Sequence, residues 1–154
     1  MILLDQLVEF YYLYDKFQET YMSPEEAFSY HETLIRKNRL GYVLEQGILL
    51  GYVEHYAISF EQLGRMVAGI PINIETEDIE NGEVALCANI TIHPRYRKGY
   101  VIKELTRQFF NANIECNYYV GHAQHRTVGM WKRYKKQESY KKWAQQEEIL
   151  NGLY

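Results

Sequence analysis

The strongest constraint on this chain lies between residues 84 and 120, where a strand, a helix and a second strand follow closely. Apolar residues alternate from Val84 to Ile92 with Ala85, Cys87, Asn89 and Thr91, so both faces are fairly apolar, a pattern typical of a central strand. His93-Pro94 ends this strand, because proline cannot continue a central ladder. A second strand is predicted over 114–120, and the helix between them has inward apolar residues: Val101, Ile102, Leu105 and Phe109. Such a unit favours parallel strands joined by a right-handed crossover.

Two helices and a hairpin precede this unit. Apolar residues recur at helical spacing from Leu4 to Phe17 and predict an amphipathic helix over residues 3–19. A second helix begins at Ser23, whose hydroxyl can cap the Glu26 amide, and Pro24 suits its first position. Residues 41–58 are rich in Val, Ile and Tyr around Gln46-Gly47, which predicts a β-hairpin.

The remaining segments complete the order of elements. Residues 60–83 carry one Arg against six acidic residues and predict a solvated connection. After Gly121, the spacing of Val128, Trp131 and Tyr134 predicts a helix, and 138–154 predict a helical C-terminal extension. This order predicts an α+β (layered α/β) fold in one domain over residues 1–154, with residues 1–38 as its N-terminal helices.

Composition limits the class of protein. A chain of 154 residues that is 47% hydrophobic and 24% charged has the make-up of a folded domain, which excludes wholesale disorder. The net charge of −3 provides no overall field for nucleic acid or a membrane. Cys87 and Cys116 form no CxxC pair, so we expect reduced thiols. There is no basic leader region and no apolar run of membrane-spanning length, so we expect a soluble, cytoplasmic protein.

A basic loop precedes the helix of the 84–120 unit. Arg95, Arg97 and Lys98 lie there, and a helix start offers free amides and the positive end of the helix dipole. The combination predicts a site for a pyrophosphate-bearing cofactor. The alternative is a solvated basic turn between two elements.

Residues 41–136 resemble the GCN5-related N-acetyltransferase (GNAT) family. The resemblance is carried by the hairpin Val43–Val53, the strand end Ile90–Pro94, Tyr96-Arg97 and Leu105, together with the order of elements. It implies a mixed central sheet flanked by helices. It also implies that acetyl-CoA lies between two splayed parallel strands and that the acetyl group passes directly to an amine.

The resemblance also assigns cofactor-binding positions. It implies that the backbone of Ile90 and Ile92 pairs with pantetheine, and that amides from Arg97 to Ile102 hold the pyrophosphate: Arg97, Lys98, Gly99, Tyr100, Val101 and Ile102. Two of these depart from the family pattern, because Tyr100 and Ile102 stand where the family has small residues, mainly glycine. Gly99 matches the first glycine only if one residue is deleted.

Two residues are candidates for catalysis. Tyr134 resembles the family's general acid, which reprotonates the departing thiolate. It stands seven residues after Thr127, where the family has Asn; starting from His125 would put Lys132 there instead. Glu54 is the candidate general base on the long hairpin strand. Strand alternation allows only one of Glu54 and His55 to face the cleft, and Glu83 is a weaker candidate.

Two other patterns suggest different chemistry. His122, His125 and Cys116 lack a fourth ligand, so we expect no metal site. Residues 126–142 carry seven basic residues against the single acid Glu138, with aromatic residues interleaved. This stretch could bind nucleic acid or the 3′-phosphate of CoA, or form a solvated helix face.

The leading hypothesis is an acetyl-CoA-dependent N-acetyltransferase that uses an unidentified amine acceptor. The alternatives are a catalytically degenerate GNAT-fold protein of phage type, in the host cytoplasm or a virion, that acts by binding, or a nucleic-acid-binding module using residues 126–142. Members of the family are often dimers, so a homodimer is also an expectation of the resemblance.

Overall fold

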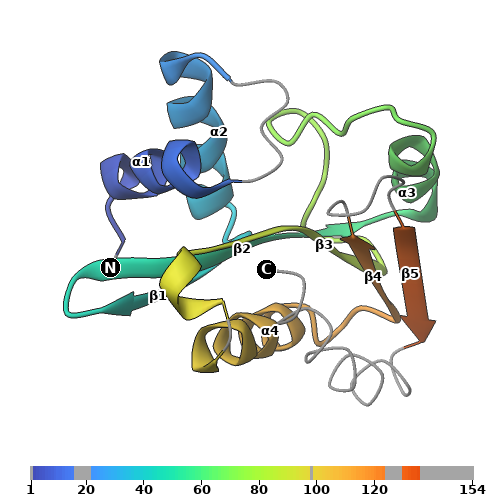
Figure 1. The fold of residues 1–154 in the computed structure, drawn as a ribbon. Coiled ribbons are helices and arrows are strands. Elements are labelled where there is room, and N and C mark those ends of the chain that lie inside the picture. The colour runs from blue at the N-terminus through green and yellow to red at the C-terminus, as the bar shows by residue number, and fades with distance from the viewer. Residues whose placement is uncertain (1, 16–21, 98, 124–129, 136–154) are drawn as a thin grey trace.

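The computed structural model describes residues 2–15, 22–97, 99–123 and 130–135 (Figure 1). The elements follow in the order α1 (Leu4–Tyr14), α2 (Pro24–Arg36), β1 (Leu40–Glu45), β2 (Ile48–Ile58), α3 (Phe60–Val67), β3 (Val84–Ile92), the 3₁₀ turn η1 (Pro94–Tyr96), α4 (Tyr100–Ala112), β4 (Tyr118–Ala123) and β5 (Met130–Lys135).

The strands form one mixed sheet in the order β1-β2-β3-β4-β5. β3 and β4 are parallel, and the other neighbouring pairs are antiparallel. Helices α1 and α2 cover one face of the sheet and α4 covers the other (Figure 1). The predicted α+β class, with a mixed sheet flanked by helices, is confirmed, and so are the hairpin and the parallel pair.

The core is divided by the sheet into two layers. On the α4 side, Val101, Ile102, Leu105 and Phe109 pack with Val53, Ala85, Ile90 and Ile92. The α1/α2 side has one cluster around Leu34, Tyr56 and Leu86 and another around Leu7, Phe10 and Tyr52. Because alternate side chains of β2 and β3 enter opposite layers, both strands are buried on both faces, as their apolar composition predicts.

Local signals set several element boundaries. The Ser23 hydroxyl accepts a hydrogen bond from the Glu26 amide at the start of α2, with Pro24 at the first position. Gln46 and Gly47 both have positive φ angles (51° and 79°), the conformation of a tight hairpin turn. The first helix ends at Tyr14, earlier than predicted, and residues 16–21 lie outside the described residues.

One helix was not predicted. The 60–83 segment begins with α3, whose start is a complete capping box: the Ser59 side chain accepts from the Gln62 amide, and Gln62 accepts from the Ser59 amide. The sequence Ser-x-x-Gln at 59–62 was the available signal.

The C-terminal part corrects two predictions. The strand expected over 114–120 begins at Tyr118, because α4 continues to Ala112 and a turn follows. The prediction of a helix around Trp131 and Tyr134 was wrong, because Met130–Lys135 form β5, which pairs antiparallel with β4. Pairing with the edge of β4 outweighed a helical spacing that only three apolar residues supported. The predicted extension at 138–154 lies outside the described residues.

None of the helices in the described ranges is long and apolar enough to cross a membrane.

Candidate functional site

β3 and its parallel partner β4 separate before either strand ends. The register between β3 and β4 ends at Cys87 and Gly121, whereas β3 continues to Ile92. On its other side β3 stays paired with β2, with a register shift between Glu54 and His55 that leaves Ala88 without a paired residue. From Ala88 to Ile92, β3 therefore has one neighbouring strand among the described residues, and the bulge lies where the parallel pair ends.

The peptide groups of Ile90 and Ile92 face the edge of β3 that is no longer paired with β4. The His93 amide donates to the Leu50 carbonyl of β2 (2.8 Å). Backbone groups alternate in direction along a strand, so those of Thr91 also face β2 and those of Ile90 and Ile92 face away from it. Their side chains are buried beneath α4, which leaves the backbone as the part available to a ligand.

Helix α4 starts at a glycine in a conformation that other residues rarely adopt. Gly99 has φ 157° and ψ −154°, and a Cβ atom there would meet nothing within 4 Å. No described side chain caps this end, where the first amides of a helix have no partner within the helix. The helix start can therefore accept an anion from solvent.

The neighbouring candidate residues occupy different environments. Val101 and Ile102 are buried in the core, so only their amides could contact a ligand. The Tyr100 hydroxyl donates to the Glu45 carboxylate of β1, and this hydrogen bond raises the pKa of Tyr100. Arg97 is half-buried, and its buried Nε atom has no partner among the described residues. Lys98 lies outside the described residues.

Glu54 is buried beneath α2. It is 5% exposed, and its Oε1 atom accepts hydrogen bonds from the hydroxyls of Tyr30 on α2 and Tyr56 on β2. The two phenolic oxygens are 2.8 Å apart, so the three groups form a closed cluster. Burial raises the pKa of Glu54, and the two phenolic hydrogen bonds act against this rise. A carboxylate with a raised pKa is suited to accept a proton.

His55 enters the opposite layer. Its Nδ1 atom lies 3.3 Å from Nη1 of Arg39 and 3.2 Å from Nδ2 of Asn113, both of which can donate to it. Burial, reinforced by Arg39, lowers the pKa of His55 to about 3, so the ring is neutral and enclosed. Of the two candidates on β2, Glu54 is therefore the one beneath α2. Glu83 is exposed at the start of β3.

The remaining catalytic candidates fall largely outside the described residues. Tyr134 lies on β5 in register with Tyr119, and its side chain is outside the description, as are Thr127 and His125. Cys87 is buried, and burial raises its pKa to about 12, so its thiol stays protonated. Within the described ranges no group of His, Cys, Asp and Glu residues could hold a metal ion.

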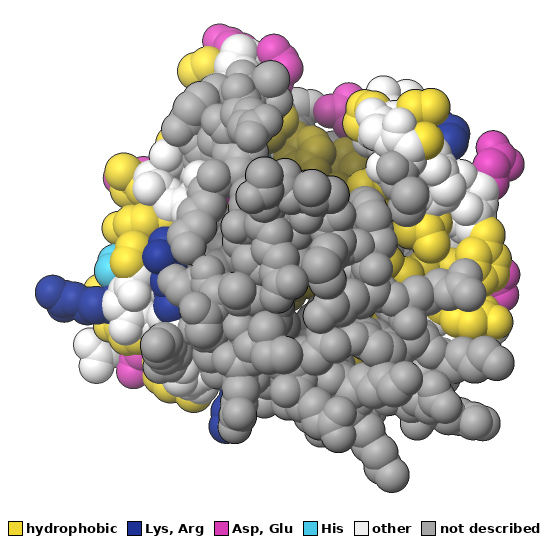
Figure 2. All heavy atoms as spheres, turned by 45° about the vertical axis from the view of Figure 1, so that its right-hand side comes forward, with side chains coloured by type: hydrophobic (Ala, Val, Ile, Leu, Met, Phe, Trp, Pro, Cys, Tyr) yellow, Lys and Arg dark blue, Asp and Glu magenta, His cyan; other side chains and the backbone are white. Residues whose placement is uncertain are grey.

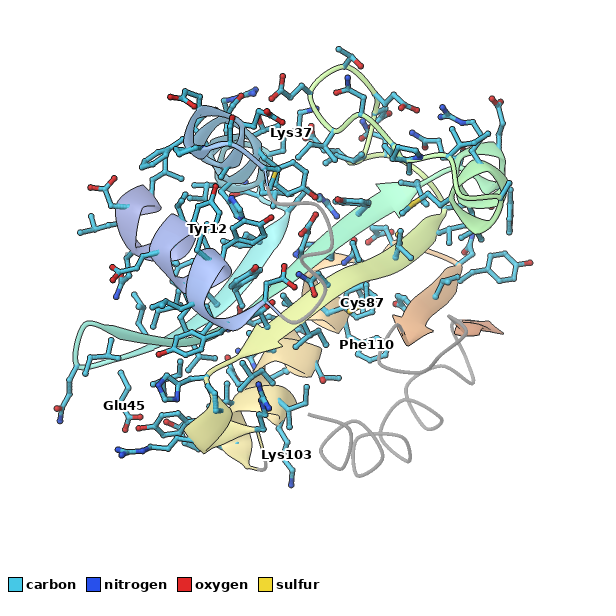
Figure 3. All side chains as sticks on the ribbon, turned by 45° about the horizontal axis from the view of Figure 1, so that its top comes forward. Tyr12, Lys37, Glu45, Cys87, Lys103 and Phe110 are labelled. Carbon is cyan, nitrogen blue, oxygen red and sulfur yellow. The ribbon has the colours of Figure 1, made fainter. Side chains whose placement is uncertain are left out.

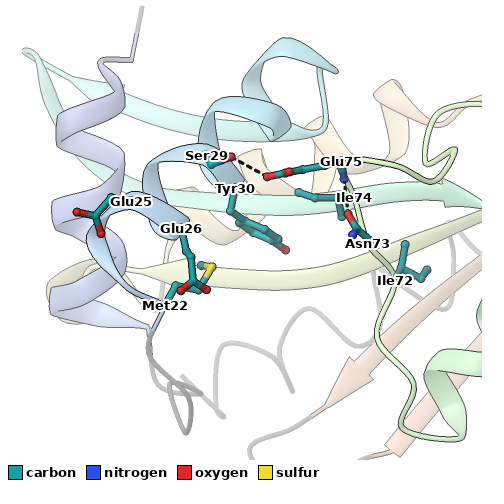
Figure 4. Close-up of a pocket in the computed structure, with 9 residues that line it drawn as sticks. All are labelled: Met22, Glu25, Glu26, Ser29, Tyr30, Ile72, Asn73, Ile74 and Glu75. Atoms are coloured by element: carbon teal, nitrogen blue, oxygen red, sulfur yellow. Dashed lines mark hydrogen bonds between the residues drawn. The ribbon is translucent and has the colours of Figure 1, made fainter.

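Sequence analysis missed a hollow of about 480 Å³ between α2 and the segment 72–75 (Figure 4). Figure 2 shows apolar side chains on the floor of a recess with acidic side chains on its upper rim. The wall is held by Ser29, which donates to Glu75 (2.7 Å), and by Lys37, which follows the end of α2 (Figure 3) and whose Nζ donates to the Ile74 carbonyl (2.7 Å). The contacts join residues 37 or more positions apart, so no local signal in the sequence could have indicated them.

Comparison with solved structures identifies the architecture. The structure titled "GphF GNAT-like decarboxylase in complex with isobutyryl-CoA" matches with a TM-score of 0.54 and 16% sequence identity. The chain has a GNAT-like fold. The match covers 77% of this chain and 60% of that protein's length. No family model and no curated protein matches the sequence.

Within this GNAT-like fold, a departure from the family pattern other than Tyr100 and Ile102 lies after β4. Where the resemblance placed a helix carrying Tyr134, the chain forms β5. The layer that covers the sheet on the α1/α2 side, in contrast, is present as expected.

Proposed function

We propose that this chain is an acyl-CoA-dependent N-acyltransferase that moves an acetyl group from acetyl-CoA to an amine. The observation that carries the proposal is the end of β3, where the peptide groups of Ile90 and Ile92 face away from β2, beyond the last pair between β3 and β4 at Cys87 and Gly121. The likeness to a GNAT-like decarboxylase in complex with isobutyryl-CoA supports an acyl-CoA as the ligand.

In this proposal, pantetheine pairs with β3 as an added strand. Its amides would exchange hydrogen bonds with the backbone of Ile90 and Ile92. The pyrophosphate would lie at the start of α4, held by the amides from Gly99 to Ile102 and by the charges of Arg97 and Lys98. The hydroxyl of Tyr100 lies on Glu45 of β1, so this larger residue need not cover the helix start.

The chemistry is a direct transfer. The amine nitrogen attacks the thioester carbon, the C–N bond forms, and the C–S bond breaks. Glu54, buried where β3 parts from β4, would take the proton that the amine loses. Tyr134 on β5 is proposed as the acid that protonates the departing thiolate.

A second candidate is a GNAT-fold protein that acts by binding without catalysis. It is favoured by Tyr100 and Ile102, which occupy positions where the family has small residues, mainly glycine. This candidate predicts no stabilisation by any acyl-CoA.

Thermal unfolding with and without millimolar acetyl-CoA tests the proposal, with isobutyryl-CoA in parallel. Ligand at 100 times its Kd adds about 2.7 kcal/mol, a shift in Tm of several degrees for a domain of this size. We expect Gly99→Trp to abolish the shift by covering the helix start. Gly69→Trp is the matched control, because Gly69 also has positive φ (85°) and open space but lies after α3.

The control separates backbone strain from loss of the site. The proposal stands if wild type and Gly69→Trp are stabilised by acetyl-CoA and Gly99→Trp is not. It fails if the wild type shows no shift, or if all three proteins shift equally.

A further inference from the structure

The hollow between α2 and segment 72–75 has the size of a small-molecule site. At about 480 Å³, it lies within the usual range for ligand pockets. Three glutamates line it, Glu25, Glu26 and Glu75, and no basic side chain is among its described lining residues. Such a lining attracts a cation, and a primary amine is a cation at neutral pH.

Tyr30 connects this hollow to the buried carboxylate. Its side chain lines the hollow and projects from α2 toward the sheet (Figure 4). Its hydroxyl donates to Oε1 of Glu54, the same oxygen that Tyr56 contacts. Tyr56 is not among the residues that line the hollow. The hydrogen-bonded route from the hollow to Glu54 therefore runs through Tyr30.

The same cluster lies beside the end of the parallel strand pair. Glu54 is the register partner of Asn89, which follows the unpaired Ala88 and the last β3–β4 pair at Cys87. The hollow, Tyr30 and Glu54 are on the α1/α2 side of the sheet at this point. An amine in the hollow would thus approach the proposed thioester site from the side of Glu54.

We infer that the hollow takes the amine acceptor and that Tyr30 passes the acceptor's proton to Glu54. This inference rests on the proposed acyl transfer. The bound ammonium first loses one proton to solvent. As its nitrogen bonds to the acyl carbon and the C–S bond breaks, an N–H proton moves to the Tyr30 oxygen while the Tyr30 proton moves to the Glu54 carboxylate. Tyr134, as in the proposed function, gives a proton to the thiolate, which leaves as CoA thiol. Glu54 then passes its proton through Tyr30 to solvent, and Tyr134 regains a proton from solvent.

Tyr30 is therefore a catalytic residue in this scheme, because it touches the acceptor, and Glu54 acts through it. Tyr56 only positions Glu54. The charged and titratable groups around the relay include Glu54, Tyr52 and Tyr56 on β2, Tyr11 on α1, Asp15 after α1, Cys87 on β3, and Glu25, Glu26 and Glu75 on the rim.

The test compares Tyr30→Phe with Tyr56→Phe, since each removes one hydroxyl from the same carboxylate oxygen. Cadaverine, spermidine and a lysine-containing peptide are titrated into the protein by calorimetry. Their acetylation is followed by release of the CoA thiol at saturating acetyl-CoA. At least one amine should bind to and be acetylated by the wild type. Tyr30→Phe should lower kcat 100-fold or more with little change in KM, and Tyr56→Phe should lower it less than 10-fold.

Three results would overturn the inference: no amine binds the wild type, an amine binds without being acetylated, or the two variants lose kcat equally. The last would show that Tyr30 merely holds Glu54. The acetyl-CoA shift in Tm reports on the proposed function separately. Its absence would reject acyl transfer and with it the relay, whereas a normal shift without amine binding would reject the acceptor site alone.

Discussion

Glu54 and His55 are adjacent on β2, yet the sheet places their side chains in different layers with opposite consequences for protonation. Both are buried, at 5% and 2% exposure. Burial disfavours the charged form of each, which raises the pKa of the Glu54 carboxyl and lowers that of the His55 imidazole. At this scale, function and stability oppose each other, because a carboxylate held ready for a proton destabilises the fold when it is ionised.

Glu54→Gln should therefore become more stabilising as the pH rises. The folded-state pKa of Glu54 lies above its unfolded value, so its favourable contribution is complete below the unfolded pKa and is lost as pH rises through the folded one. Glutamine keeps an oxygen that Tyr30 and Tyr56 can contact and cannot ionise. Urea unfolding of both proteins between pH 4 and 8 measures the difference. If the unfolding free energies of the two proteins changed with pH in the same way, the pKa of Glu54 would be the same in the folded and unfolded states.

At the scale of elements, the acidic segment after α3 is part of the sheet's support. The Ala57 amide at the end of β2 donates to the Ile79 carbonyl (2.7 Å), and the Gly82 amide donates to the Ala57 carbonyl (3.0 Å). This segment thus bonds the end of β2 beyond Glu54, where the register with β1 stops. Gly82 permits the contact, because a Cβ atom there would lie 2.0 Å from the backbone of Ile58.

Two glycine-to-alanine changes in the same region should alter the unfolding free energy in opposite directions. Gly82→Ala forces backbone against backbone and should cost about 3 kcal/mol or more of unfolding free energy. Gly64→Ala lies within α3, where a Cβ meets nothing within 4 Å, and should add about 0.5–1 kcal/mol through helix propensity. Chemical denaturation measures both. A harmless Gly82→Ala would contradict the close packing of this segment on β2.

At the scale of the whole molecule, each layer holds a buried histidine. His31 on α2 lies against Tyr11, with ring centroids 4.9 Å apart, and its Nδ1 atom is 2.7 Å from the Ala27 carbonyl. His55 lies in the α4 layer. Burial lowers the pKa of both rings. A lowered folded-state pKa gives stability that is present above the unfolded pKa and is lost as the pH falls toward the folded value, so acid should weaken both layers.

A substitution of His55 can measure how much of the loss of stability in acid is due to this residue. With a folded pKa of about 3 against 6.5 unfolded, His55 should remove about 2 kcal/mol of stability between pH 7 and 5. The unfolding free energy of His55→Gln should fall by about 2 kcal/mol less between pH 7 and 5 than that of the wild type, whatever the stability of the variant at pH 7. Denaturant unfolding at several pH values gives both slopes. Equal slopes would show that His55 becomes protonated within the folded protein.

The local elements were predictable because their signals lie within a few residues. Ser23 and Glu26 fix the start of α2, Gln46-Gly47 fix the hairpin turn, and the apolar stripe from Val101 to Phe109 fixes the buried face of α4. The alternation from Val84 to Ile92 predicted a central strand and hence a parallel unit with β4. Glu54 was chosen for its place on the long strand, and alternation correctly separated it from His55.

Only the tertiary structure decided what depends on contacts between distant residues. Met130–Lys135 became a strand because β4 offered an edge to pair with, which the spacing of apolar residues does not record. Glu54 accepts a hydrogen bond from Tyr30, which lies 24 positions away on α2. The hollow forms because Ser29 and Lys37 hold residues 74 and 75 beside that helix. Periodicity and caps specify single elements, whereas burial and hydrogen bonding between elements, which set the proton affinity of Glu54, arise only when the layers pack.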